Sequence, residues 1–467
     1  MDDLLTTGLL AFLLFLVFLH SLLRCRTRRV LDIFEPILIV SFLYFIYFGV
    51  RAIFLLCSSE NPFHIRPETV NLALVYAVLG IAFMHVGYYS RLPIIVSRNI
   101  PKSGEGFSRK RMISVIVVLY VVGLLARITI LNRGWYFGPG LLQYRDEIPP
   151  QFMIVNQLSV LSQHAFMLAL IYYFYFSKKS KPAKALMILM VYQELFFAFL
   201  HGTRSTMLYP MVSGSLIWFY SIKKPSKVHV LLGVFSLVSL AVFVIFPLSH
   251  AFRFSIPYYE VRTGVLSSQG IDLARRAISK YFEEFSLAGS LEFALNRFAG
   301  IDSLGLFIEV TGKEINFQYG KTFLGPLIAS FIPRVIWTSK YQTLETLRMW
   351  RAEDVLTFEI LGQSGSMVAP TQIGDLYLNF HLPGILIGMF LYGVLYRVFY
   401  IYFVRASTPL RLFPYAVVFY WLVLIEGGTW YLAGAVGKNL LISLAICSLI
   451  SMKSAKRIPV NDKWLGG

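Results

Sequence analysis

Residues 4–23 read LLTTGLLAFLLFLVFLHSLL, and the basic run RCRTRR follows at 24–29. Twenty residues without a charge are long enough to cross a bilayer as one helix. A cluster of arginines directly after such a run is typical of a cytoplasmic flank. Asp2 and Asp3 precede the run where a signal peptide has a basic region, and no small-residue cleavage site follows. The stretch therefore predicts a retained membrane helix that begins outside.

The composition of the whole chain agrees with this first helix. Of its 467 residues, 57% are hydrophobic and only 15% are charged, and the mean hydropathy is +0.64. Soluble domains carry about 25% charged and about 45–50% apolar residues. A soluble enzyme, a disordered chain and a disulfide scaffold are therefore excluded, and the three scattered cysteines offer neither metal spacing nor a disulfide framework. We expect an all-α polytopic membrane protein.

Runs of about twenty apolar residues predict about eleven spans. They lie at 4–23, 33–57, 70–90, 112–132, 152–176, 185–201, 206–222, 228–249, 376–403, 412–431 and 433–452. Every second connection is basic, including RCRTRR, KKSKPAK at 178–184 and KKPSK at 223–227, whereas the alternate connections are short and nearly neutral. Since basic loops prefer the cytoplasm, we predict an outside N-terminus and a cytoplasmic C-terminal tail at 453–467. Topology then accounts for most of the net charge of +18, and nucleic acid is not an expected partner.

One outside segment is of domain size. Residues 250–375 separate eight spans in 1–249 from three spans in 376–452. Two stretches of this loop have amphipathic helical patterns. One is DLARRAISKYFEEF at 272–285, and the other is 290–311, with a stop at Gly312. The apolar stretch at 320–333 is too short to span, and we expect it to lie in the interface or to dip into the membrane.

Four arginines are predicted on the outer side of the membrane. Arg204 lies in a tight turn between two spans, Arg253 follows the eighth span, Arg145 lies in the loop after the fourth, and Arg297 lies in the large loop. A guanidinium is always charged and binds phosphate bidentately. Such a cluster suits an anionic lipid headgroup such as a polyprenyl pyrophosphate. The alternative is topological anchoring, or ion pairing with Asp146, Glu147 or Glu260.

Candidate acid–base groups are fewer. Asp375 opens the ninth span, Glu426 lies at the outer end of the tenth, and His201 precedes Arg204 by less than one helical turn. Ionisable groups at membrane depth are expensive and are functional candidates by default. For Glu426, and for Glu194 in the sixth span, a site role and a structural polar lock are both open, and His201 could equally cap a helix. Metal-binding motifs such as HExxH are absent from the sequence, and the first outer loop, at 58–69, holds no acidic pair.

Four stretches together resemble the bacterial O-antigen polymerase (Wzy) family, nearest the branch that includes the enterobacterial common antigen polymerase. They are GTRSTMLYP at 202–210, FIPRVIWTSK at 331–340, VAPTQIGDLYLNFHLPG at 368–384 and EGG at 426–428. The order of these stretches and the large outer loop match the family layout. His381 departs from the pattern, because glycine is expected in that NFG-like turn.

The resemblance implies a GT-C-like, metal-independent glycosyltransferase of the bacterial inner membrane that uses no cofactor. The donor would be a glycan on undecaprenyl pyrophosphate, and the acceptor a sugar hydroxyl on an incoming lipid-linked repeat unit. The implied partners are this lipid-linked oligosaccharide, membrane lipids and a Wzz-type chain-length regulator. Arg204, Arg253, Arg145 and Arg297 would stabilise the leaving pyrophosphate, and Asp375, His201 or Glu426 would act as the base.

Two other functions remain open. An O-antigen ligase of the same superfamily would pass a finished glycan to a lipid core and would use the same arginines. A lipid-linked oligosaccharide flippase would move its substrate without chemistry, but transporters commonly show inverted repeats, and the sequence shows none.

Overall fold

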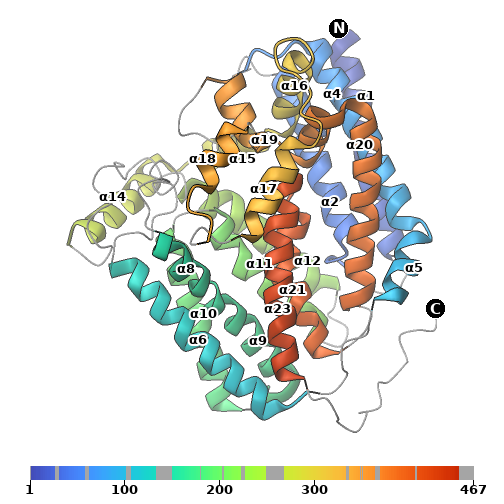
Figure 1. Cartoon of the computed structure of the whole chain (residues 1–467). Coiled ribbons are helices and arrows are strands. Elements are labelled where there is room, and N and C mark those ends of the chain that lie inside the picture. Colours follow the sequence, from blue (N-terminus) through green and yellow to red (C-terminus); the bar gives the residue numbers. More distant parts are fainter. Residues whose placement is uncertain are drawn as a thin grey trace.

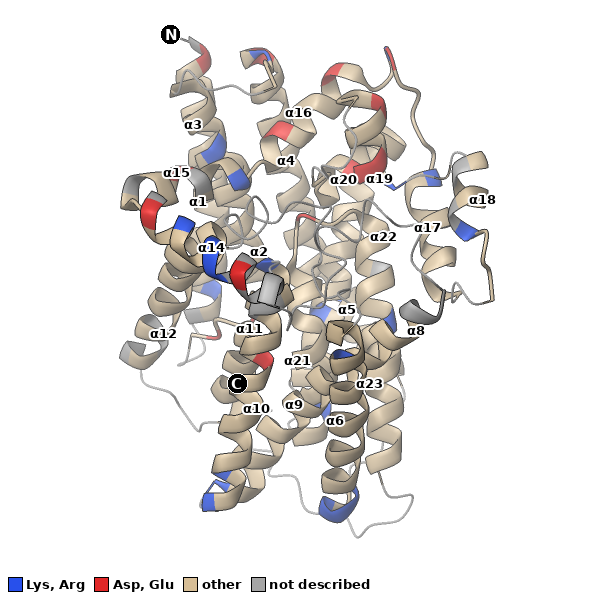
Figure 2. Cartoon of the chain, turned by 90° about the vertical axis from the view of Figure 1, so that its left-hand side faces the viewer, with Lys and Arg blue, Asp and Glu red and all other residues tan. Residues whose placement is uncertain are grey.

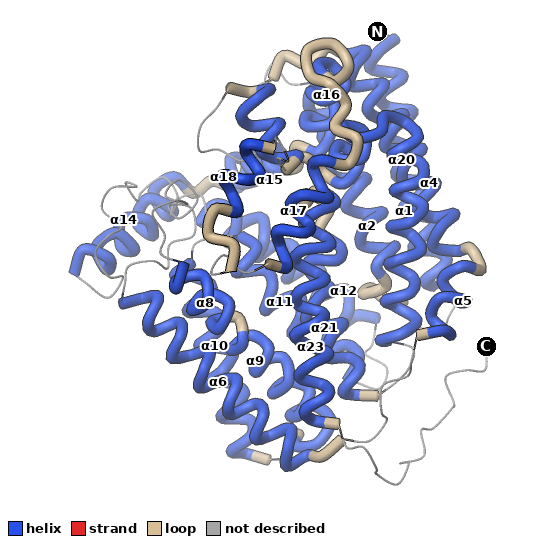
Figure 3. The backbone as a smooth tube through the Cα atoms, viewed as in Figure 1, coloured by secondary structure: helices blue, strands red, loops and turns tan. Residues whose placement is uncertain are grey.

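The computed structural model describes residues 2–26, 31–57, 63–100, 107–132, 150–178, 180–201, 204–221, 227–248, 268–332, 336–347, 349, 351–362, 369–404 and 408–451. Within these residues the regular structure is helical, with two isolated bridges between single residues and no strand (Figure 1; Figure 3). The expectation of an all-α chain is therefore confirmed for the described part.

Seven of the described helices are long and apolar enough to cross a membrane. They are Asp3–Cys25, Pro36–Cys57, Pro67–Tyr89, Arg109–Asn132, Ile154–Ser177, Gln372–Val404 and Thr429–Ile450. Two shorter apolar helices cover Leu232–Leu248 and Pro409–Val423. The chain is thus a multi-pass membrane protein by length and composition. The predicted stretches at 185–201 and 206–222 also form helices but are not among the seven, so the count of about eleven spans stays a prediction.

The first half of the chain contains the helices α1 (Asp2–Arg26), α2 (Pro36–Tyr44), α3 (Arg51–Cys57), α4 (Pro67–Tyr89), α5 (Leu92–Asn99), α6 (Arg109–Asn132), α8 (Pro150–Ser159), α9 (Leu161–Tyr172), α10 (Lys181–His201), α11 (Arg204–Ser221) and α12 (Lys227–Leu240). The π-helical turns η1 (Phe45–Val50), η2 (Tyr173–Ser177) and η3 (Ala241–Ile245) continue α2, α9 and α12. Because η1 joins α2 to α3 without a break, these three elements form one continuous span.

The second half contains α14 (Ser268–Glu284), α15 (Leu287–Arg297), α16 (Gly300–Val310), α17 (Lys321–Phe331), α18 (Lys340–Thr346), α19 (Ala352–Asp354), α20 (Gln372–Phe399), α21 (Pro409–Val423), α22 (Thr429–Tyr431) and α23 (Gly437–Ile450). The π-helical turns here are η4 (Val355–Ile360), η5 (Tyr400–Val404) and η6 (Leu432–Val436). The predicted span 412–431 ends at Val423, so Glu426 lies in the turn that follows α21 and not in a helix.

The closest helix pair in the core is α4 with α20, and two glycines make it possible. A Cβ atom on Gly87 would lie 2.1 Å from the Phe390 carbonyl oxygen, and one on Gly393 would lie 2.0 Å from the Met84 carbonyl oxygen. Real side chains do not tolerate such distances, and small residues are what allow two backbones to approach within a membrane. The pair fixes α20, which carries Asp375, against the first part of the bundle.

Part of the large predicted loop packs against the membrane helices. α16 is almost wholly buried and packs against α4 and α20. Arg51 on α3 donates to both carboxylate oxygens of Asp302 on α16, at 3.0 and 3.1 Å, and to Asn296 at 2.7 Å. Arg51 and Asp302 are 1% and 0% exposed. Because a buried charge needs its partner, this ion pair anchors the segment onto the span from Pro36 to Cys57.

Both amphipathic stretches of the loop form helices, but the stretch at 290–311 is broken where one helix is predicted. The predicted helix at 290–311 is two helices, α15 and α16, which break at Phe298–Ala299, and Gly312 (φ +84°) follows the end of α16 as expected. α14 forms over the other stretch. Ile278 and Phe282 of α14 and Phe285 directly after it are exposed, whereas Tyr281 on the same face donates its hydroxyl to the Phe243 carbonyl oxygen at 2.6 Å.

The apolar stretch at 320–333 forms α17, which packs against α20, α22 and η6. Ser330 lies beside Gly434 and Phe331 beside Gly437, where an added Cβ would meet them at 3.2 and 3.1 Å. Gly437 is eight residues beyond Thr429, which corresponds to about 12 Å along a helix. α17 therefore runs beside the beginning of the last span, consistent with the expectation that it dips toward membrane depth.

The two ends of the bundle differ in charge, because acidic residues, together with some Lys and Arg, are concentrated at one end. Lys and Arg lie in the terminal turns of α6 and α10 at one end, whereas Asp and Glu lie around α4, α16, α19 and α20 at the other (Figure 2). We call these the basic end and the acidic end. The N-terminus of α1 lies at the acidic end (Figure 1; Figure 2). This distribution is the one that the alternation of basic loops predicts, and which end faces the cytoplasm stays a prediction.

Candidate functional site

A short turn between α21 and α22 is the centre of the polar groups at the acidic end. It reads IEGGTW at 425–430. The Ile425 carbonyl oxygen accepts the backbone N–H of Gln372 at 3.1 Å, which joins the turn to the first residue of α20. The Tyr47 hydroxyl, from η1, donates to the half-buried Glu426 carboxylate. The turn thus holds Glu426 between α20 and the span from Pro36 to Cys57.

Asp375 lies in the first turn of α20, as predicted, and is fully buried. Its carboxylate accepts hydrogen bonds from the Thr322 hydroxyl at 2.5 Å, the Thr429 backbone N–H at 2.6 Å and the Asn379 amide at 3.0 Å. These three donors come from α17, α22 and α20. Asp375 therefore connects α17, the turn and α20, and its accepting capacity is largely used within the protein.

A third carboxylate, that of Glu353 in α19, faces the same turn. Both of its oxygens accept from the Trp430 indole N–H, at 3.1 and 3.0 Å. The Arg351 guanidinium lies 3.6 Å from Glu353 and 5.1 Å from the Trp430 ring centroid. Burial raises the pKa of Glu353, and the adjacent Arg351 charge partly opposes that effect. Three carboxylates thus surround a turn of six residues.

Arg204, the first residue of α11, is a half-buried cation beside this group. Its guanidinium carbon lies 5.4 Å from the centroid of the Phe246 ring and within electrostatic range of the Tyr47 and Tyr420 hydroxyls. Among the described residues, no hydrogen bond or ion pair of its side chain to an acid is found. A half-buried cation without an acidic partner is suited to an anionic ligand.

The end of α15 reaches the same place. The ring of Phe298, directly after Arg297, lies 4.8 Å from the Tyr47 ring and 6.3 Å from the Phe246 ring. Arg297 is half-buried and belongs to the last turn of α15. His201 ends α10 and is also half-buried, and only residues 202–203 separate it from α11. The predicted residues Arg204, Arg297, His201, Glu426 and Asp375 therefore all border the acidic end near one turn.

Two predicted phosphate-binding residues, Arg145 and Arg253, lie outside the described residues, as do their alternative partners Asp146, Glu147 and Glu260. Within the described residues, no group of three or more His, Cys, Asp or Glu side chains is placed to hold a metal ion. The site described above therefore consists of one cation without an acidic partner, three carboxylates and a border of tyrosine and tryptophan rings.

Two other polar residues that the sequence places within spans, Glu194 and His85, have structural partners. Arg127 donates to both oxygens of Glu194, at 2.7 and 2.8 Å, and both side chains are buried. This pair resolves the alternatives for Glu194 in favour of a polar lock between α6 and α10. His85 contacts Ser21 at 2.7 Å and the Ile81 carbonyl oxygen at 2.8 Å, so it is a packed core histidine.

The backbone conformation at His381 accounts for the glycine that the resemblance leads one to expect at this position. The backbone there has φ +56° and ψ −149°, a region that glycine adopts far more readily than other residues, and α20 is kinked at Phe380–His381. Gln318 and Tyr319 donate their backbone N–H groups to the carbonyls of Leu378 and Asn379 next to the kink, at 3.0 and 3.2 Å. The glycine-type turn is therefore kept although the side chain is histidine, and the His381 ring packs 5.0 Å from the Tyr377 ring.

Sequence reasoning missed the groups that connect the candidate residues. Tyr47, Thr322, Glu353 and Trp430 contact Glu426, Asp375 or each other, but each comes from a different element. A tyrosine within an apolar span and a threonine in a short apolar helix have no motif that sets them apart. A fifth residue, Asn379, could have been predicted from the sequence, because it lies four residues after Asp375 on the same helix face.

Comparison with known proteins shows a family but no named activity. No curated protein has significant sequence similarity to the chain. No solved structure has significant similarity to it either. The profile of a domain of unknown function (DUF8712) matches residues 112–402, from the beginning of α6 to η5, which is more than half of the chain. The chain belongs to the DUF8712 family.

Proposed function

We propose that this protein is a GT-C-like membrane glycosyltransferase with about eleven spans that polymerises oligosaccharide repeat units carried on undecaprenyl pyrophosphate. The site faces the periplasm in this proposal, and the basic end faces the cytoplasm of the bacterial inner membrane. The observation that carries the proposal is Arg204, a half-buried cation with no acidic partner among the described residues, next to the Tyr47–Glu426 contact at the acidic end.

The reaction needs three events at one place. The bond between the anomeric carbon of the donor sugar and the pyrophosphate oxygen breaks. A new bond forms from that carbon to an acceptor hydroxyl oxygen, and the hydroxyl proton leaves to a base. Negative charge accumulates on the departing pyrophosphate, and a preorganised guanidinium stabilises it most when little water competes. We propose Arg204 for this role, with Arg297, Arg253 and Arg145 assisting.

The candidate bases differ in burial and in the hydrogen bonds that they accept. Asp375 is fully buried and accepts three hydrogen bonds from the protein, so we assign it to holding α17, α20 and the turn together. Glu426 is half-buried and its recorded partner is a single tyrosine hydroxyl. A general base must reach the proton that it removes. Glu426 is therefore the preferred base, with His201 as the second candidate.

The test is polymerisation by the purified protein in liposomes. Supplied only with a lipid-linked repeat unit, the protein should produce a ladder of longer lipid-linked glycans and release undecaprenyl pyrophosphate. A ligase would instead need a lipid-core acceptor and give a single transfer. A flippase would move the lipid-linked unit across the bilayer with no new glycosidic bond. Absence of a ladder in the presence of a bound donor would contradict the polymerase proposal.

A further inference from the structure

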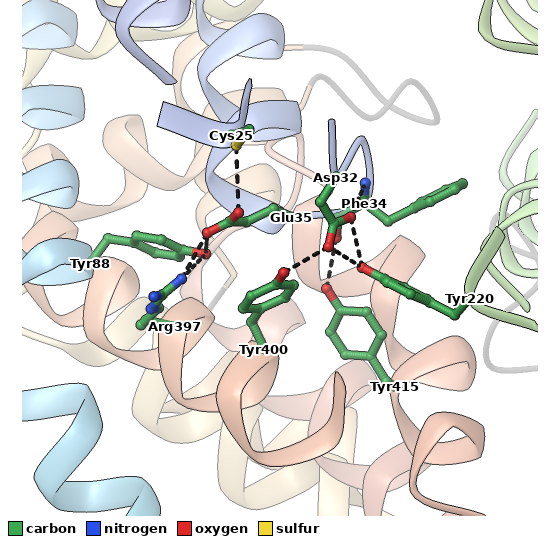
Figure 4. Close-up of polar contacts among 9 residues, drawn as sticks. All are labelled: Cys25, Asp32, Phe34, Glu35, Tyr88, Tyr220, Arg397, Tyr400 and Tyr415. Atoms are coloured by element: carbon green, nitrogen blue, oxygen red, sulfur yellow. Dashed lines mark hydrogen bonds and ion pairs between the residues drawn. The ribbon is translucent and has the colours of Figure 1, made fainter. Parts of the chain in front are cut away.

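A second group of polar side chains lies at the opposite end of the same helices. We call it the inner cluster: Asp32, Glu35, Arg397 and the tyrosines Tyr88, Tyr220, Tyr400 and Tyr415, with Cys25 beside them (Figure 4). The half-buried Asp32 accepts from the Tyr400 hydroxyl at 2.7 Å, from the Tyr220 hydroxyl at 2.9 and 3.0 Å and from the Phe34 backbone N–H at 3.1 Å. One carboxylate thus receives donors from three elements.

Glu35, which precedes α2, makes the other half of the cluster. It accepts from Arg397 Nη1 at 2.7 Å and from the Tyr88 hydroxyl at 2.7 Å, and the Cys25 thiol lies 3.5 Å away. Tyr415 donates to the Phe34 carbonyl oxygen at 2.9 Å, between the two acids. The cluster therefore joins the end of α1, the beginning of α2, the end of α4, the end of α11, the end of α20 with η5, and α21.

The helices of the inner cluster are the ones that carry the candidate site. α11 begins with Arg204 and has Tyr220 as its last residue but one. α20 has Asp375 in its first turn and Arg397 in its last turn. The span that Glu35 precedes carries Tyr47, and α21, which contains Tyr415, leads into the turn of Glu426. Since a helix rises about 1.5 Å per residue, the two groups lie about 20–30 Å apart.

Asp32 is the titratable group of this cluster. Loss of hydration raises the pKa of Asp32 to about 6, hydrogen bonds from Tyr400 and Tyr220 act to lower it, and the nearby Glu35 charge adds to the rise. The groups facing it are Tyr400 on η5, Tyr220 on α11 and Tyr415 on α21, with Glu35 on its own segment. Arg397 on α20, Tyr88 on α4 and Cys25 on α1 lie behind Glu35.

The sign of the effect follows from the direction of the shift. The pKa in the closed cluster exceeds the ordinary value of 3.8. The closed arrangement is therefore favoured below that ordinary value, and its advantage declines as the pH rises through about 6. Two pKa units correspond to a change of up to about 100-fold in the ratio of closed to opened cluster. Above pH 6 the ionised Asp32 favours any arrangement that admits water.

We propose that the inner cluster is a proton-sensitive latch at the basic end that positions the four helices bearing the candidate site at the acidic end. Protonation of Asp32 closes the latch, and ionisation loosens it. α11 carries the change to Arg204, because Tyr220 and Arg204 belong to the same helix, which continues through Pro210. An effect of the latch on the rate of turnover rests on the proposed function. The opening and closing of the latch can be measured without substrate.

The test measures accessibility at position 205, next to Arg204. A Ser205→Cys variant is made in a Cys57→Ser background, because Cys57 is exposed whereas Cys25 and Cys447 are buried. In liposomes, a membrane-impermeant maleimide added outside labels only molecules whose position 205 faces outward, so their basic end faces the interior. The interior pH is set between 5 and 7.5 while the outside stays at 7.5. Turnover of the lipid-linked repeat unit is recorded separately.

We expect the labelling rate to fall by about tenfold as the interior pH decreases from 7.5 to 5, because about half of the two-unit pKa difference lies within this range. Asp32→Asn, which is permanently neutral, should label at the slow rate at every pH. Tyr400→Phe, which removes a bond that lowers the pKa, should move the midpoint to higher pH. Tyr172→Phe, at the end of α9 with its ring packed on Phe176, is the matched control with an unchanged midpoint.

A labelling rate that does not change with interior pH would overturn the latch, as would an unchanged titration in Asp32→Asn. If Asp32→Asn does not fold, an unshifted midpoint in Tyr400→Phe overturns it equally. Labelling that titrates as expected in a protein that forms no polymer would instead contradict the proposed function and leave the latch supported.

Discussion

Replacing Arg204 by alanine should separate a ligand-binding arginine from an anchoring one. The side chain makes no ion pair among the described residues, and its recorded contact is the face of Phe246 at 5.4 Å. Such a cation–π contact contributes about 0.5–1 kcal/mol, so the loss of stability should be small. A contact to a charged ligand contributes about 1.5–3 kcal/mol. At about 1.4 kcal/mol per factor of ten, Arg204→Ala should slow polymerisation by about 10- to 150-fold.

The assay compares polymer ladders, donor binding and thermal unfolding for each purified variant at equal protein concentration. Arg204→Lys keeps the charge but loses the two-pronged guanidinium, and should restore only part of the rate. Arg66→Ala is the matched control. Arg66 is largely exposed and is paired with Glu309 at 3.3 Å, so its removal should change neither rate nor stability appreciably.

Normal polymerisation by Arg204→Ala would refute the reasoning, and would show that the pyrophosphate is held elsewhere, with Arg204 acting as an anchor at the membrane surface. A rate loss matched by an equal loss of folded protein would assign Arg204 to stability. Only a loss of rate and donor binding in a folded protein agrees with the proposed role.

Three further results are expected. Arg51→Met leaves the buried Asp302 unpaired and should destabilise the protein in denaturant unfolding by about 3–5 kcal/mol, most of which the double variant with Asp302→Leu should recover. Chelation with EDTA should leave polymerisation intact, because the proposed mechanism stabilises the leaving pyrophosphate with arginines, and activity restored only by a divalent ion would contradict this. In a Cys57→Ser background, impermeant maleimide added to intact cells should label Lys313→Cys but not Lys184→Cys, and the opposite pattern would reverse the predicted orientation.

The apolar runs predicted the helices because hydrophobic length is a local property. The first span, the long span that begins near Asp375 and the stop before Gly312 all agree with the sequence prediction. The end of α21 at Val423 was not predicted, because the turn that follows is itself apolar apart from Glu426 and its two glycines. Hydropathy alone does not distinguish a turn held by buried hydrogen bonds from a continuing helix.

The sequence predicted the charged residues of the candidate site, but not the residues that they contact. Arg204 and Glu426 stand out as ionisable residues at the ends of apolar runs. Tyr47 does not, because its contact with Glu426 spans 379 positions of sequence. The pairing of Glu35 with Arg397 spans 362 positions and was likewise invisible. Such contacts depend on how the helices pack, and they cannot be predicted from a single sequence.

The ion pair between Arg51 and Asp302 bears on how the protein is made. Asp302 is synthesised 251 residues after Arg51, which at about 5–20 residues per second is a delay of about 10–50 s. In the predicted topology, an arginine that is finally buried enters the membrane during that interval without its counter-ion, and water, lipid phosphate or an insertion factor must shelter it. Assembly of this bundle is therefore completed by its late helices, and a chain that stalls before α16 should be a substrate for membrane quality control.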